Sequence, residues 1–214
     1  MTYDFDTPVD RSGTYSLKWE EAGDALPMWV ADMEFQTAPQ IRAALQQRLD
    51  HGIFGYSIVP PAWNQAYVDW WHRRHNLDID PESLVFSTGV VPAISSMVRK
   101  LTTANENVLI QTPVYNIFFN SIINNGCRVL ESPLEYDGSG HYSINWADLE
   151  SKLADPQTTL MILCNPHNPV GRIWDRDTLA RIGELCWNHH VTVISDEIHC
   201  DLTDPGYDYV PLPR

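Results

Sequence analysis

From Leu84 onward, the chain alternates between segments with the period of a β-strand and segments with the period of a helix. Strand-like apolar runs occupy 84–88, 107–111, 127–132, 159–164 and 191–195, and helical patterns lie between them at 94–101, 115–125, 146–153 and 177–188. This alternation predicts an α/β fold, in which a mostly parallel sheet is flanked by helices and each crossover is right-handed.

The N-terminal part follows a different pattern. Residues 1–36 are irregular and predict an extended arm. Thr37 is the expected N-cap of a helix with a buried stripe at Ile41, Leu45 and Leu49, which Gly52 terminates. A second helix is expected from Pro61, with its aromatic residues on one face: Trp63, Tyr67, Trp70 and Trp71.

The charge of the chain disfavours two classes of partner. Asp and Glu number 28 against 14 Lys and Arg, a formal net charge of -14, which disfavours binding to nucleic acid and to anionic membranes. The four cysteines lack a C-x-x-C spacing, so buried reduced thiols are expected. The sequence shows neither an apolar leader nor a run of 18 apolar residues, and we expect a cytoplasmic protein.

Small and aromatic residues follow the first two predicted strands, at the edge of the sheet where ligands bind in open α/β folds. Gly89 allows close backbone approach, and the amides of Val90 and Val91 open a helix where a phosphate would be favoured. The same glycine also suits an ordinary turn. Tyr115 could stack on an aromatic ring, or it could belong to the core or to a hydrophobic staple.

An amide and a carboxylate follow the last two predicted strands. Asn168 lies between Pro166 and Pro169, which fix the backbone and either orient the amide or simply make a rigid turn. Asp196 follows four strand-forming residues, so its carboxylate is expected to be half-buried and to need a partner. That partner could be a protonated pyridine nitrogen, or an arginine such as Arg172 or Arg181.

A metal site is the remaining interpretation of this segment. Asp196, Glu197, His199 and Asp201 are residue types that bind first-row metals. Because successive strand residues point to opposite faces, Asp196 and Glu197 do not ligate together if the strand continues. We therefore expect no metal here.

Five segments in sequence order resemble fold-type I pyridoxal-phosphate enzymes of aminotransferase class I/II, and within them the MalY/PatB group of carbon–sulfur β-lyases of the cystathionine β-lyase type. The matching segments are PMWVADMEF at 27–35, GY at 55–56, TGVVP at 88–92, NPHNPVGR at 165–172 and SDEIHCD at 195–201. The resemblance implies a large domain that binds pyridoxal 5'-phosphate, incomplete here at 49–214, and a small-domain arm and helix at 1–48.

The resemblance also implies roles for individual residues. Gly89, Val90 and Val91 would bind the cofactor phosphate, Tyr115 would stack on the pyridine, Asn168 would meet its O3′ and Asp196 its N1. His199 would lie on the O3′ side. Tyr56 would reach the phosphate of a neighbouring subunit, which implies a homodimer.

The resemblance implies a carbon–sulfur lyase that releases a thiol, pyruvate and ammonia from a small sulfur amino acid. Its Schiff-base lysine would follow Asp196, whereas Lys18, Lys100 and Lys152 all precede it. We therefore expect the catalytic lysine to lie beyond residue 214, and this chain alone to be inactive or very weak. An aminotransferase and a non-catalytic binding or regulatory remnant remain alternatives.

Overall fold

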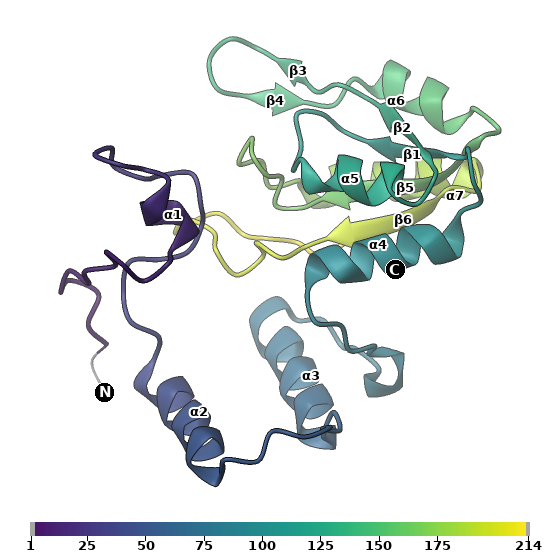
Figure 1. The fold of residues 1–214 in the computed structure, drawn as a ribbon. Coiled ribbons are helices and arrows are strands. Elements are labelled where there is room, and N and C mark those ends of the chain that lie inside the picture. Colours follow the sequence, from purple (N-terminus) through teal and green to yellow (C-terminus); the bar gives the residue numbers. More distant parts are fainter. Residues whose placement is uncertain (1–2, 213–214) are drawn as a thin grey trace. The chain divides into compact units, whose positions relative to one another are not determined.

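The chain forms two compact units that divide between Ile58 and Val59. The computed structural model describes residues 3–212. In the first unit lie the helices α1 (Leu17–Glu20) and α2 (Pro39–His51). The second unit contains all the β-strands that the described residues form, together with helix α3 (Pro61–His75) and the helices that follow it (Figure 1).

Helix α2 confirms the predicted helix and its end but not its cap or its buried face. Gly52 has φ 71° and its N–H donates to the Arg48 carbonyl, as expected of a glycine that ends a helix. The N-cap is Ala38 rather than Thr37, because Pro39 already occupies the first helical position. The expected buried stripe was wrong: the exposed fractions of Ile41, Leu45 and Leu49 are all above one half.

A four-stranded parallel sheet forms the centre of the second unit. Its order is β2 (Arg128–Glu131), β1 (Asn107–Ile110), β5 (Thr158–Cys164) and β6 (Thr192–Asp196). A separate antiparallel pair, β3 (Glu135–Tyr136) with β4 (Tyr142–Ser143), flanks residues 137–141. The predicted α/β class with a parallel sheet is confirmed.

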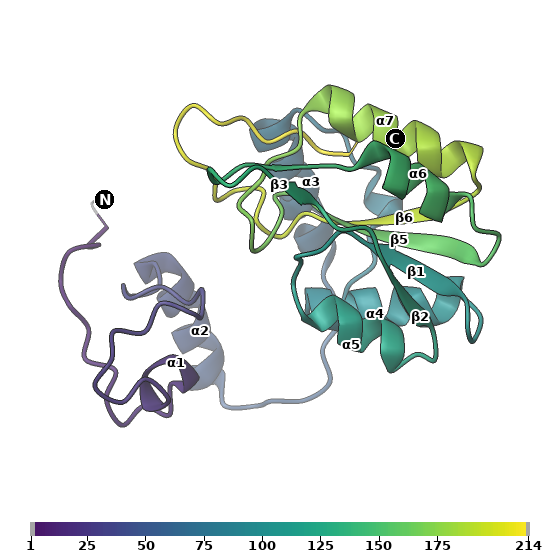
Figure 2. The same ribbon diagram turned by 90° about the horizontal axis from the view of Figure 1, so that it is seen from above.

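Helices cover both faces of this sheet, as Figure 2 shows. On one face lie α4 (Val90–Leu101) and α5 (Ile117–Ile123), and on the other lie α6 (Trp146–Leu153) and α7 (Arg176–Asn188). Along β5, alternate side chains enter the two resulting cores: Leu160 and Ile162 pack with the first pair of helices, and Met161 and Leu163 with the second. The unbroken apolar run from Leu160 to Cys164 is therefore buried on both sides of the sheet.

The predicted strand at 84–88 is not formed. The residues follow a short 3-10 helix, η1 (Pro81–Ser83), and Leu84 has extended dihedrals. Val85 is 88% exposed and Phe86 51%. The apolar pattern favours an extended chain, but a strand also needs a neighbouring ladder, and no described strand pairs with this segment.

Two further expectations concern the thiols and membrane spans. All four cysteines are buried and free, as predicted: Cys127, Cys164, Cys186 and Cys200. Among residues 3–212, no helix is long and apolar enough to cross a membrane.

Candidate functional site

A cavity of about 680 Å³ opens within the second unit between α3, α4 and the carboxyl end of β6. The four aromatic residues predicted to share one face of α3 all contribute to its wall. Two predicted site residues, Val90 and Asp196, also line it. Gly89, Val91, Tyr115, Asn168 and His199 do not contribute to that wall.

Asp196 is the last residue of β6, and its carboxylate is only weakly satisfied by the protein. The residue is 7% exposed, and the Ile198 N–H donates to Oδ1 over 3.2 Å. Burial raises the pKa of the Asp196 carboxyl, against the lowering effects of the Ile198 amide and of His199, while Glu197 adds to the rise. No ion pair to Asp196 occurs among the residues that the structure describes.

The arginines considered as partners of Asp196 are engaged elsewhere, so that interpretation was wrong. The Arg172 guanidinium lies 5.7 Å from the centre of the Trp174 ring, and that of Arg181 lies 4.0 Å from the Trp146 ring. A buried carboxylate without a cation has to accept hydrogen bonds, be protonated or meet a charged ligand. Asp196 is thus suited to receive a cationic N–H donor from the cavity.

The loop after β5 is held by Asn165, a residue to which the sequence analysis gave no role. Asn165 is fully buried and its amide donates to the Val210 carbonyl over 3.0 Å and accepts from the Trp174 N–H over 3.1 Å. Its own N–H donates to the Asp196 carbonyl over 2.9 Å. Its place in an Asn-Pro turn directly after a buried strand was the only sequence signal that could have suggested this role.

Asn168, by contrast, keeps its side-chain amide free of hydrogen bonds to residues within 3–212, although its backbone is fixed. Its N–H donates to Cys164 Sγ over 3.4 Å. Burial raises the pKa of the Cys164 thiol to about 11, and the nearby charge of Asp196 adds to that rise. Cys164 pairs with Asp196 across β5 and β6, so one buried sulfur lies near both predicted ligand-binding residues.

The first backbone N–H groups of α4 have no capping side chain. Gly89 is the N-cap and carries extended dihedrals, with no side chain capping the helix. Val90 is partly buried, and Val91 is 38% exposed. The free N–H groups of a twelve-residue helix attract an anion. The predicted phosphate position is thus open.

Tyr115 lies beyond β1 on a loop that a buried histidine holds. His167 Nε2 lies 3.0 Å from the Pro113 carbonyl, and the residue is 1% exposed. Burial lowers the pKa of His167. Because a carbonyl oxygen only accepts hydrogen bonds, Nε2 is the donor in this contact. The Tyr115 ring makes an edge contact with Phe118 at 6.0 Å yet stays 37% exposed, so one side of it can contact a ligand.

The two remaining predicted site residues, His199 and Tyr56, differ in how deeply they are buried. His199 is partly buried in the turn after β6, close enough for its charge to lower the pKa of Asp196. Tyr56 belongs to the first unit and is fully exposed. Its predicted contact with a neighbouring subunit remains a prediction.

Residues 27–212 match the family of aminotransferase class I and II, and the chain belongs to this family. Cystathionine beta-lyase PatB from Bacillus subtilis is 48% identical over 97% of this chain and 55% of its own length. Protein MalY from Escherichia coli is 36% identical over 98% of this chain and 55% of its own. The chain thus spans about half the length of these relatives.

A solved structure carries the same fold. Cystalysin from Treponema denticola, a crystal structure that contains a pyridoxal 5'-phosphate cofactor, superposes with a TM-score of 0.93 at 35% identity. The match covers 99% of this chain and 56% of that chain. Family and fold therefore agree with the resemblance drawn from the five sequence segments.

Proposed function

We propose that this chain supplies the pyridoxal-phosphate-binding part of a carbon–sulfur β-lyase that acts on small sulfur amino acids such as cystathionine or cysteine. The observation that carries the proposal is the buried Asp196 carboxylate, which lines a cavity and lacks a cationic partner among the described residues. The relatives named as a cystathionine β-lyase and as a pyridoxal-phosphate protein support the reaction class and the cofactor.

The residues present fit this cofactor in charge and type. The Asp196 carboxylate would accept a hydrogen bond from a protonated pyridine nitrogen and hold its proton there. The free amide of Asn168 would donate to the phenolic oxygen O3′, with His199 on the same side. Both strand ends are already tied together by the Asn165 N–H, which limits the reorganisation that binding requires.

The remaining contacts would hold the phosphate and the ring face. Gly89, with the uncapped amides of Val90 and Val91, would bind the phosphate at the start of α4. The exposed side of the Tyr115 ring would stack on the pyridine. Tyr56 would reach the phosphate of a second subunit, and we propose a homodimer on that basis.

Bound pyridoxal phosphate supplies an electron sink for a substrate carbanion, and a cationic pyridine held by Asp196 strengthens that sink. None of the three lysines of this chain lines the cavity. Lys18 pairs with Glu34 and Lys152 with Asp148, while Lys100 is exposed near the end of α4. A positioned base contributes ~10²- to 10⁴-fold, so we expect this chain alone to be inactive or very weak.

Two alternatives each have one supporting observation. Membership of the aminotransferase family favours an aminotransferase, since both reactions start from the same carbanion. The absence of a lysine from the cavity wall favours a non-catalytic binding or regulatory remnant. Whichever function holds, we propose a cytoplasmic location. We also propose that residues 1–48 are the arm and helix of a small domain and that residues 49–214 belong to the large domain.

The test combines cofactor retention with turnover. The purified chain is mixed with pyridoxal phosphate, dialysed, and assayed for thiol and pyruvate release from cystathionine, with a parallel assay for amino-group transfer to a keto acid. We expect saturable binding that dialysis removes, and negligible thiol release. Cofactor retained through dialysis together with thiol release would contradict the expected inactivity. Failure to bind the cofactor at all would contradict the proposed site.

A further inference from the structure

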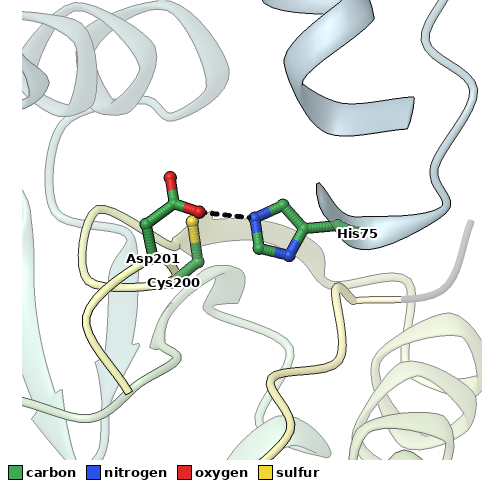
Figure 3. Close-up of side chains that lie close together, drawn as sticks. All are labelled: His75, Cys200 and Asp201. Carbon is green, nitrogen blue, oxygen red and sulfur yellow. Dashed lines mark hydrogen bonds and ion pairs between the residues drawn. The ribbon is translucent and has the colours of Figure 1, made fainter. Parts of the chain in front are cut away.

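A cluster of three different metal-binding side chains lies at the C-terminal end of α3, outside the residues proposed to hold the cofactor. His75 Nε2 faces Asp201 Oδ1 at 3.0 Å, with Cys200 beside them (Figure 3). The imidazole, thiol and carboxylate ligand atoms all lie within 4.8 Å of one another. His75 comes from the helix, whereas Cys200 and Asp201 come from the turn that follows β6.

Neighbouring rings fix the direction of two of these side chains. The His75 imidazole is 7% exposed and packs against the Trp71 ring at 4.8 Å and the Tyr209 ring at 5.0 Å. The Trp70 Nε1–H donates to Asp201 Oδ2 over 2.8 Å, which leaves Oδ1 directed at the imidazole. A partner that holds the second oxygen of a ligating carboxylate is typical of metal sites.

We propose that His75, Cys200 and Asp201 form a binding site for one divalent transition-metal ion, with zinc the best match. A nitrogen, a sulfur and an oxygen ligand suit this borderline-soft cation, which accepts three protein ligands plus one exchangeable position. Because Cys200 and Asp201 also line the cavity, the fourth position would face it and hold water. Binding forms the metal–nitrogen, metal–sulfur and metal–oxygen bonds, breaks the S–H bond of Cys200, and releases that proton to solvent.

Charged side chains around the site have opposite effects on the affinity for a cation. The carboxylate of Glu197 lies close enough to act on the Cys200 thiol, and its negative charge favours a cation. Arg74 opposes binding, because its Nε lies 3.5 Å from Asp201 Oδ1. Removing the Arg74 charge should therefore tighten metal binding, which is the opposite of the effect of removing a ligand.

The test is a titration of the reduced, cofactor-free chain with Co²⁺, followed by competition with Zn²⁺. We expect one Co²⁺ per chain, a thiolate-to-cobalt charge-transfer band, and its loss when zinc is added. Cys200→Ser should remove the band. His75→Gln should weaken binding at least as much as loss of an outer-shell partner does, about 10- to 100-fold. Arg74→Gln should strengthen it.

Two matched variants control for general effects on the fold. His72→Gln removes another histidine–carboxylate contact of α3, the one with Asp78 at 2.7 Å, and should leave cobalt binding unchanged. Cys127→Ser removes a buried thiol elsewhere and should keep the band. The absence of a thiolate band in the unmodified chain would overturn the proposal, as would a band that survives in Cys200→Ser. Since the titration uses no pyridoxal phosphate, its outcome is independent of the function proposed above.

Discussion

Strand β5 and the segment 84–88 have similar apolar sequences, yet only β5 is a strand. β5 pairs with β1 on one side and β6 on the other, and six of its seven residues are buried. The segment 84–88 pairs with no described strand, and Val85 and Phe86 are exposed. The difference shows that pairing and burial decide which apolar run becomes a strand. The proposed site has two corresponding parts. Asn168 and Asp196 follow the paired strands β5 and β6, whereas Gly89, Val90 and Val91 follow the unpaired segment 84–88 at the start of α4.

The largest expected effect is a difference in stability between a substitution in β5 and one in the segment 84–88. Ile162→Ala, at 1% exposure in β5, should lower the free energy of unfolding by about 2–5 kcal/mol. Val85→Ala should change it by less than about 0.5 kcal/mol, because that side chain is already exposed. Urea unfolding of both variants checks this. Equal losses would show that 84–88 is packed as tightly as β5.

The second prediction compares the two asparagines of the loop after β5. Asn165→Ala leaves the Val210 carbonyl and the Trp174 N–H without partners, and should lower the free energy of unfolding by about 1–3 kcal/mol. Asn168→Ala loses no side-chain hydrogen bond within the described chain and should leave stability within about 0.5 kcal/mol. Its pyridoxal-phosphate affinity should fall instead, as measured by equilibrium titration. A large stability loss in Asn168→Ala would make it a structural residue and weaken its proposed role.

The third and smallest effect concerns the charge at the end of β6. The pKa of the folded Asp196 carboxyl is raised above its usual value of 3.8. The folded chain therefore binds this proton more tightly than the unfolded chain, and stability falls as pH rises from the unfolded pKa through the folded one. Asp196→Asn removes this loss, so the variant should gain stability near neutral pH relative to the parent.

Unfolding measured across pH from 3 to 8 would check this sign. The stability difference between Asp196→Asn and the parent should shrink as pH falls below the folded pKa. A parent that becomes more stable through Asp196 as pH rises would mean that the carboxylate has a cationic partner in the folded chain.

Much of the fold was predictable because its information is local. The helix at 146–153 was predicted with its observed bounds, and the helix at 177–188 begins one residue earlier, at Arg176. Errors arose where the outcome depends on a partner distant in sequence. The apolar stripe of α2 is exposed, and residues 84–88 pair with no described strand.

The proposed site residues differ in the same way in how far the sequence indicates them. Asp196 ends β6 and Asn168 lies in the loop after β5, positions that the pattern of strands indicates directly. The contact of His75 with Asp201 joins residues 126 apart, and no periodicity could indicate it. Asn165 was missed because burial, and not its residue type, gives it a structural role.

The most direct test of the account is the protonation state of the bound cofactor's ring nitrogen. The chain is titrated with pyridoxal phosphate labelled with ¹⁵N in the pyridine, and the ¹⁵N chemical shift is recorded at pH 8 for the parent and for Asp196→Asn. We predict a protonated nitrogen in the parent and a neutral one in the variant. A neutral nitrogen in the parent, or the same shift in both, would contradict the role of Asp196 on which the proposed function depends.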